Sequence, residues 1–213
     1  MTPKHHPSQP LLIDYAAGSV DLGVRLIIAT HVQSCAYCAR EVSLAEGVGG
    51  ALLDALPPAD MLPDALAQAL ARIERPVGPG DPAPAARPDW IRVSPEVLHA
   101  AQRRRRWAAP GVWVAPISKG PAKGESTYLL RVAAGMSMPR HTHRGAEVVC
   151  VLKGAFTDGD TVYGPGDFAW SDQTVDHRPV ITPDSECVCL TFAQGPLVPR
   201  DWVGRVFQPF VGI

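Results

Sequence analysis

The sequence predicts an α + β protein of two domains, a small helical bundle followed by an all-β barrel. Apolar residues recur at helical spacing within residues 1–74, whereas within residues 90–213 they alternate with polar residues and are interrupted by Gly and Pro turns. Between these patterns, RPVGPGDPAPAARP contains five prolines, which disfavour both helix and sheet. Residues 75–89 are therefore expected to form an extended, semi-rigid linker between the domains.

The composition limits the classes of function. The chain has 213 residues, and its net charge of -1 gives no reason to expect direct binding to nucleic acid. No apolar run approaches the length of a membrane span, and the first ten residues, MTPKHHPSQP, lack the apolar core of a secretion signal. The five cysteines, an odd number, fit reduced thiols better than a disulfide framework. We therefore expect a cytoplasmic protein with no membrane partner.

Four helices are expected before the linker. Their apolar faces contain Leu11, Leu12 and Tyr15; Val24, Ile27, Ile28 and His31; Val42, Ala45 and Val48; and Leu66, Leu70 and Ile73. Gly18 and the pair Gly49–Gly50 are expected to punctuate the runs, Pro57–Pro58 to end the third, and Pro63 to begin the fourth. A bundle this small buries little apolar surface, so a metal ion that ties its helices together makes physical sense.

The stretch HVQSCAYC supplies three metal-binding side chains, His31, Cys35 and Cys38. On a helix His31 and Cys35 share a face, and Cys-x-x-Cys at a turn between helices lets two thiolates close on one ion. Redox chemistry of the thioredoxin type is the alternative, but it favours a βαβ context and no adjacent histidine. Zinc is expected, in a structural rather than a catalytic site, because thiolate-rich tetrahedral sites are usually closed.

The fourth zinc ligand is expected from the pair His5 and His6, which precedes the first helix. Either imidazole could swing onto the site between the second and third helices. His6 is preferred because it lies nearer the first helix, and it would complete His2Cys2 coordination. The alternative is a solvated pair of terminal histidines with no role.

His6, His31, Cys35 and Cys38 together resemble the zinc-binding anti-sigma domain over roughly residues 1–74. The resemblance implies a module that binds a bacterial sigma factor of the extracytoplasmic function group and keeps it from core RNA polymerase. Residues 1–74 contain four basic and eight acidic residues, a net charge of -4. That charge would suit docking against basic sigma-factor surfaces, although an ordinary acidic solvated face would give the same value.

The β segment contains a second constellation, Gly135-x5-His141-x-His143-x3-Glu147-x6-Gly154. His141 and His143 are two apart, so both point to one face of a strand, and Glu147 returns to that face after an even step. With His177 they form a set of three imidazoles and one carboxylate suited to Zn, Mn, Fe or Ni. The alternative is four polar residues satisfied in a barrel core without metal, which would need costly hydrogen-bond partners.

The spacing of these glycines, histidines and glutamate resembles the first motif of the cupins, which implies a jelly-roll barrel with a metal at His141, His143, Glu147 and His177. The second cupin motif fits at Gly159 and Pro165. The usual Pro-x-Gly before its histidine is replaced by the stretch from Asp172 to Asp176, DQTVD.

The remaining polar and sulfur-bearing groups are interpreted without a ligand. The run Arg103–Arg106 is expected to be a solvated face at the entry to a strand, and His99 a surface or structural residue. Cys150 is expected to face away from the metal. Cys187 and Cys189 share a strand face and are expected to be small core residues, with a redox-active pair as the alternative.

Taken over the full length, an N-terminal zinc module, a Pro-rich linker and a cupin resemble the ChrR-type anti-sigma factors. The resemblance implies a transcriptional regulator in a 1:1 complex with an extracytoplasmic function sigma factor, released under oxidative stress such as singlet oxygen, with the cupin as sensor. The alternative is a metal-dependent cupin enzyme, a dioxygenase or isomerase. A DNA-binding regulator is disfavoured by the acidity of the helical half.

Overall fold

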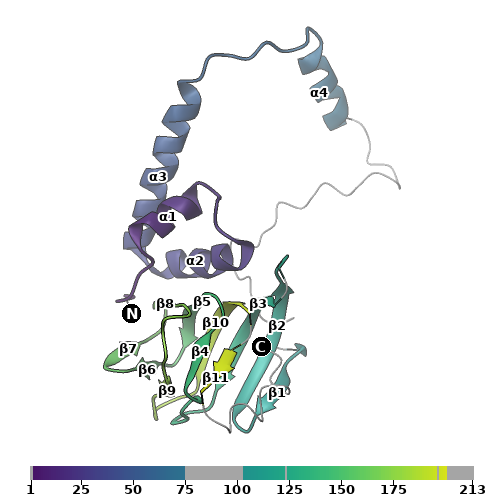
Figure 1. Cartoon of the computed structure of the whole chain (residues 1–213). Coiled ribbons are helices and arrows are strands. Elements are labelled where there is room, and N and C mark those ends of the chain that lie inside the picture. Colours follow the sequence, from purple (N-terminus) through teal and green to yellow (C-terminus); the bar gives the residue numbers. More distant parts are fainter. Residues whose placement is uncertain (1, 75–102, 123, 196, 201–213) are drawn as a thin grey trace.

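The computed structural model describes residues 2–74, 103–122, 124–195 and 197–200 (Figure 1). Its helices are α1 (Gln9–Ala16), α2 (Leu22–Ser34), α3 (Ala36–Asp54) and α4 (Ala65–Glu74). Its strands are β1 (Arg106–Ala109), β2 (Val112–Lys119), β3 (Glu125–Val132), β4 (His141–His143), β5 (Glu147–Lys153), β6 (Phe156–Asp158), β7 (Thr161–Tyr163), β8 (Phe168–Ser171), β9 (Val180–Ile181), β10 (Cys187–Gln194) and β11 (Leu197–Pro199). The predicted order, four helices and then strands, is confirmed, while the expected linker and His99 lie outside the described residues.

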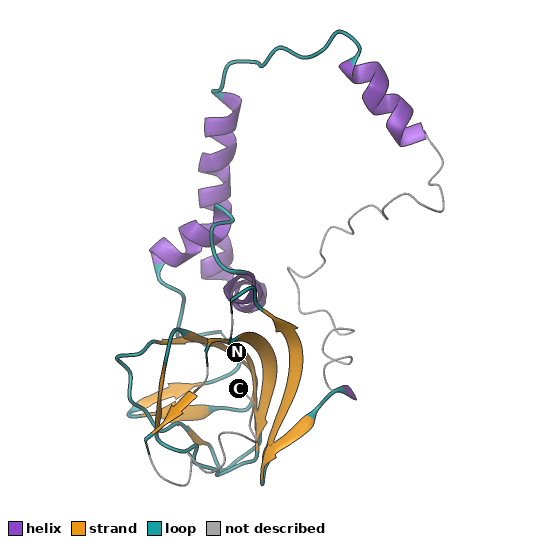
Figure 2. Cartoon of the chain, turned by 45° about the vertical axis from the view of Figure 1, so that its right-hand side comes forward, coloured by secondary structure: helices purple, strands orange, loops and turns teal. Residues whose placement is uncertain are grey.

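The strands form a barrel of antiparallel sheets. A six-stranded sheet has the order β1-β2-β3-β10-β5-β8, and it faces a two-stranded sheet, β11-β4, and a three-stranded sheet, β7-β6-β9 (Figure 2). An isolated antiparallel bridge pairs His141 with His177 and brings the two predicted cupin motifs together. The residues of β10 alternate between the barrel interior and the outer face of the sheet, which is the period-two pattern read from the sequence.

The helix boundaries follow the expected signals with one exception. Gly49 and Gly50, expected to punctuate the third run, lie inside α3, which ends at Asp54 before the Pro57–Pro58 pair. A Cβ at either glycine would meet nothing within 4 Å, so these glycines serve no close packing. Each glycine costs a helix only about 1 kcal/mol relative to Ala, too little to break one of this length.

Helix α2 packs on the outer face of the six-stranded sheet, and α1 and α3 pack on α2 and on each other (Figure 1). One buried cluster joins Val24, Ile27 and Ile28 of α2 to Phe192 of β10 and further residues of β5 and β8. The approach is so close that a Cβ added to Gly23 would lie 2.0 Å from the Phe192 ring. Helices and barrel therefore share one hydrophobic core, which the linker between the two patterns gave no reason to expect.

The fourth helix stands apart from the other described elements. It has no buried residue, and it continues a segment that already leaves the barrel along the second half of α3 (Figure 1). We call residues 44–74 the helical arm. Its exposed large apolar side chains are Leu44, Val48, Leu52, Leu53, Leu56, Met61, Leu62, Leu66, Leu70 and Ile73.

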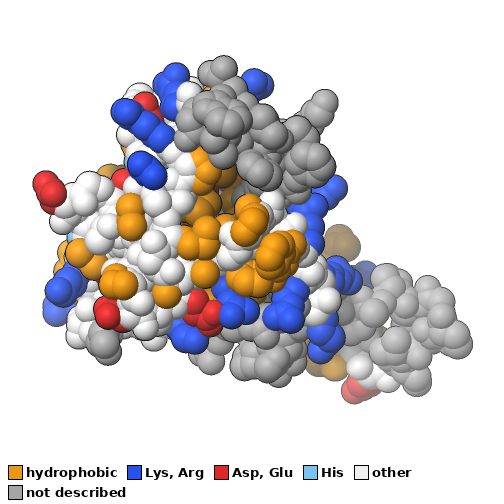
Figure 3. Space-filling model, turned by 90° about the horizontal axis from the view of Figure 1, so that it is seen from below, with side chains coloured by type: hydrophobic (Ala, Val, Ile, Leu, Met, Phe, Trp, Pro, Cys, Tyr) orange, Lys and Arg blue, Asp and Glu red, His pale blue; other side chains and the backbone are white. Residues whose placement is uncertain are grey.

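The end of the barrel away from the helices has a different surface. Figure 3 shows it from below, with hydrophobic side chains near the middle of the face and Lys and Arg around them. Among the described residues, no helix has both the length and the apolar character needed to cross a bilayer.

Candidate metal centres

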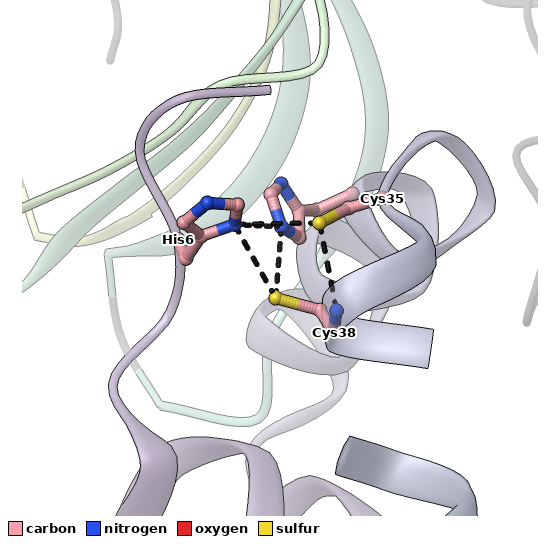
Figure 4. A group of neighbouring side chains, drawn as sticks. His6, Cys35 and Cys38 are labelled. Atoms are coloured by element: carbon pink, nitrogen blue, oxygen red, sulfur yellow. Dashed lines mark hydrogen bonds between the residues drawn. The ribbon is translucent and has the colours of Figure 1, made fainter. Parts of the chain in front are cut away.

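The first candidate centre lies where α2 meets α3, beside residues 2–8. We call these residues, which precede α1, the N-terminal lead. His31 is in the last turn of α2, and Cys35 is both the C-cap of α2 and the N-cap of α3, where its sulfur accepts from the Cys38 amide. His6 reaches the two thiols from the lead before α1 (Figure 4). The structure thus brings together the four residues that the sequence predicts as zinc ligands.

The distances in this cluster fit a tetrahedral ion. His6 Nδ1 lies 3.4 Å from His31 Nε2, 3.3 Å from Cys35 Sγ and 3.5 Å from Cys38 Sγ, and His31 Nε2 lies 3.3 Å from Cys38 Sγ. Zinc bound at roughly 2.0–2.1 Å to nitrogen and about 2.3 Å to sulfur places neighbouring ligand atoms about 3.3–3.8 Å apart. The ligand atoms therefore have the spacing that zinc requires.

Burial makes this cluster unfavourable without a cation. Burial raises the pKa of Cys38 to about 12, so its thiol keeps its proton unless a positive charge lies beside it. Burial also lowers the pKa of His31, which favours the neutral imidazole that a metal needs. A thiolate pair with neutral imidazoles is the donor set that zinc prefers.

Of the two N-terminal histidines, only His6 enters the cluster. His5 Nε2 lies 3.1 Å from the Val162 carbonyl oxygen, and its ring packs against Tyr163 at 4.5 Å between centroids. His5 is thus an attachment of the lead to β7. Successive residues of an extended chain point to opposite sides, so one of the pair faces the strand and the other faces the cluster.

The second candidate centre lies inside the barrel. His177 Nε2 lies 3.1 Å from both His143 Nε2 and His141 Nε2, and His143 Nε2 lies 3.8 Å from Glu147 Oε2. Neighbouring ligands of an octahedral ion at roughly 2.1 Å are about 3.0 Å apart, so the distances from His177 to the other two imidazoles fit such a site. His177 belongs to the group although the expected Pro-x-Gly before it is absent.

The barrel histidines are oriented by hydrogen bonds on their other ring nitrogens. His141 Nδ1 lies 2.8 Å from the Pro139 carbonyl oxygen, and His177 Nδ1 lies 2.6 Å from Asp158 Oδ2. Both contacts place the proton on Nδ1 and turn the Nε2 lone pair toward the shared centre. Asp158 is a supporting residue that the motif spacing did not reveal.

The electrostatics of the barrel cluster also favour a cation. Burial raises the pKa of Glu147 to about 7, an effect partly opposed by a hydrogen bond from Tyr128. Burial and the neighbouring histidines lower the pKa of His143 to about 4. The cluster therefore offers neutral imidazoles and one carboxylate whose charge is costly until an ion balances it.

A cavity of about 470 Å³ opens beside this cluster. Its wall is mostly apolar and aromatic, and it includes Trp170 and Ser171 of β8. Cys187 and Cys189 also line it as free thiols, buried as predicted, with their sulfurs 3.6 Å apart. Cys150 packs in the core beneath the helices, on the opposite face of the sheet from the metal cluster, as expected.

Besides Asp158, the residues that sequence reasoning missed lie in the turn between β7 and β8. The Gly166 carbonyl oxygen accepts from His31 Nδ1 at 2.7 Å, and Asp167 Oδ1 accepts from the backbone amides of Lys4 and His5 at 2.5 and 2.9 Å. The sequence of this stretch, Gly164-Pro165-Gly166-Asp167, indicates a turn but does not indicate what packs on it. These contacts connect the barrel directly to the first cluster.

Comparisons with known proteins agree with this architecture. Residues 94–197 match the family model described as the ChrR cupin-like domain. The anti-sigma-E factor ChrR of Cereibacter sphaeroides is 34% identical over 216 residues, covering 100% of both chains. The crystal structure of Rhodobacter sphaeroides SigE in complex with the anti-sigma ChrR matches with a TM-score of 0.74 and 32% identity, over 91% of this chain and 100% of the other.

The structural match extends beyond the barrel to most of the chain, and the sequence match extends over all of it. The match to this relative therefore covers both the helical segment and the barrel. The chain belongs to the family of ChrR-type anti-sigma factors.

Proposed function

We propose that this chain sequesters an extracytoplasmic function sigma factor in a 1:1 complex and releases it in response to oxidative stress such as singlet oxygen. The observation that carries the proposal is the full-length match to the anti-sigma-E factor ChrR. The matched crystal structure, which by description holds SigE with the anti-sigma ChrR, supports a sigma factor as the partner class.

The helical arm supplies the surface for that partner. Met61, Leu66 and Ile73 expose 75%, 71% and 80% of their area, far more than single apolar residues packed at the edge of a core. Contiguous exposed apolar surface marks an interaction site. The helical segment is also acidic, which suits the basic surfaces of a protein that binds nucleic acid.

The N-terminal cluster would hold zinc and keep α2, α3 and the lead in the form that grips the sigma factor. The supporting observations are the ligand spacing and the two buried thiols described above. The binding free energy of a structural zinc site is on the order of 10 kcal/mol and is available for folding. Zinc at His6, His31, Cys35 and Cys38 would therefore contribute much of the stability of this small helical segment.

The barrel would act as the sensor. Its cluster of His141, His143, Glu147 and His177 would hold Zn, Mn, Fe or Ni beside a cavity large enough for a small molecule. A modified barrel would favour a state of the helices with lower sigma affinity, and the shift is limited by the difference in affinity between the two states. Catalysis is not proposed, because the relative that matches along the whole chain is a regulator.

Co-expression with a tagged extracytoplasmic function sigma factor tests the partner. A stable 1:1 complex is expected, and Ile73→Asp on the arm should weaken it at least tenfold because a charge would enter an apolar contact. Val162→Asp is the matched control, since Val162 is 52% exposed on the barrel rather than on the arm. Absence of any complex with a panel of such sigma factors would refute the proposal.

A second experiment separates gripping from sensing. Cys35→Ser should abolish sigma inhibition, whereas His141→Ala should leave inhibition intact and blunt release when a photosensitiser generates singlet oxygen. An intact response in His141→Ala would refute the sensor assignment and favour direct oxidation of Cys35 and Cys38.

A further inference from the structure

Three consecutive residues of the barrel contact His31 and the backbone just before His6. Gly166 binds the His31 ring, and Asp167 and Phe168 bind the backbone of Lys4 and His5. We propose that this turn positions the histidine half of the cluster, with Asp167 as the positioning residue, so that tight metal binding at the helices depends on the barrel. The inference rests on the proposed function in one respect, that the cluster holds zinc. It adds a physical route by which the barrel influences zinc binding at the helices, and through it the binding of the sigma factor.

Gly166 fixes the orientation of His31. Its carbonyl oxygen accepts from Nδ1 at 2.7 Å, which leaves the Nε2 lone pair directed at His6 and Cys38. A Cβ at Gly166 would lie 2.8 Å from Pro3 Cγ and 2.8 Å from Ser34 Oγ, and its φ is +87°. Only glycine lets this carbonyl approach both the lead and the end of α2.

Asp167 fixes the backbone that carries His6. The side chain is buried, and Oδ1 accepts from the amides of Lys4 and His5 while Oδ2 accepts from the Gly164 amide at 2.8 Å. The Phe168 amide donates to the His5 carbonyl oxygen at 3.1 Å. Both the amide and the carbonyl oxygen of His5 are thus hydrogen-bonded to the barrel, immediately before His6, the residue that enters the cluster.

The thiols and the imidazoles of the cluster are therefore positioned by different contacts. The thiols of Cys35 and Cys38 are carried by the junction of α2 and α3, whereas the imidazoles depend on the barrel turn. Groups that orient metal ligands typically change metal affinity by about 10–100-fold when they are removed. The barrel thus contributes to zinc affinity without contributing a ligand.

The same strand continues from this turn to the barrel cavity. β8 begins at Phe168 and ends at Ser171, which lines the cavity and pairs with Glu147 of β5. Three residues of strand span about 10 Å. A displacement of β8 by a change in the cavity would therefore reach the histidine half of the cluster with no other element between them.

Cobalt titration of the full chain tests the proposal. Bound Co²⁺ gives a thiolate-to-cobalt charge-transfer band at a Cys2His2 site, and the His3Glu cluster of the barrel has no sulfur ligand. Asp167→Ala, which removes the carboxylate, and Lys4→Pro, which removes one donor amide, should each weaken the cobalt affinity of this band tenfold or more. Lys4→Ala keeps the amide, and Asp160→Ala removes an exposed carboxylate of the β6–β7 turn; both should match the parent.

The variants and the parent have distinct outcomes. If Asp167→Ala does not fold, Lys4→Pro decides, because it changes an exposed residue of the lead and leaves the barrel sequence intact. Parent-like cobalt affinity in the folded Asp167→Ala and Lys4→Pro variants would overturn this inference alone. A parent chain that gives no thiolate-to-cobalt band would overturn the zinc assignment of the proposed function, and this inference with it.

Discussion

Metal binding to the barrel should release a proton from Glu147 below pH 7. Burial raises the pKa of this carboxyl from 4.5 to about 7 in the metal-free fold, which corresponds to about 3 kcal/mol. The cost is absent below pH 4.5, where the carboxyl is protonated in folded and unfolded chains alike. It grows as pH rises to 7 and is fully present above, so this group destabilises the metal-free protein at alkaline pH.

The proton count follows from the same pKa. With a pKa near 7, about nine-tenths of Glu147 is protonated at pH 6 and about one-tenth at pH 8. Mn²⁺, which prefers oxygen and nitrogen to thiolate, should therefore displace about nine-tenths of a proton from Glu147 at pH 6. Calorimetric titrations in two buffers of different protonation enthalpy give the protons released, and the difference between the parent and Glu147→Gln isolates this carboxyl.

Equal proton release by the parent and Glu147→Gln at pH 6 would refute the reasoning. Tyr128→Phe provides a check of sign, because the hydrogen bond from Tyr128 lowers the pKa of Glu147. Its loss should move the pH dependence of Mn²⁺ binding to higher pH. A shift to lower pH would contradict the assigned cause.

Three further perturbations test the packing and the supporting contacts. Phe192→Ala should lower the free energy of unfolding by about 3–5 kcal/mol in denaturant titrations, since the ring is buried between α2 and the sheet. Val162→Ala, at an exposed position, is the control, and an equally small loss for Phe192→Ala would contradict a shared core. Gly166→Ala should speed zinc loss to a chelator, whereas Gly159→Ala, also at positive φ but with nothing within 4 Å of its Cβ, should not. Asp158→Asn should weaken Mn²⁺ binding about tenfold and leave the thiolate-to-cobalt band unchanged; the opposite pattern would reassign Asp158.

Both candidate clusters could be predicted because most of their members are close in sequence. His31, Cys35 and Cys38 lie within eight residues at the junction of two helices, and His141 and His143 share a face through the alternation of a strand. The attachment of the helices to the barrel could not be predicted in this way. The Asp167 contact with Lys4 spans 163 residues, and a Gly-Pro-Gly-Asp sequence indicates a turn without indicating what packs on it.

The helical arm illustrates the same limit. The spacing of Leu66, Leu70 and Ile73 predicted α4, because an apolar face at helical period requires little else. It did not predict that the face would remain exposed. An apolar stripe indicates that a helix needs a partner, and it says nothing about whether the partner belongs to the same chain.

The packing of α2 on the sheet bears on how a bound sigma factor could be released. The side of α2 that contacts the sheet packs against Phe192 and its neighbours. The exposed apolar residues of the arm lie on α3, on α4 and between these helices. The barrel and a bound sigma factor would thus contact different elements of the helical segment and would not compete for one surface. This arrangement does not favour release by eviction, in which the barrel would take the place of the sigma factor. Release would instead come from a loosening of the helical segment that weakens its contacts with the sigma factor while the sigma factor is still bound.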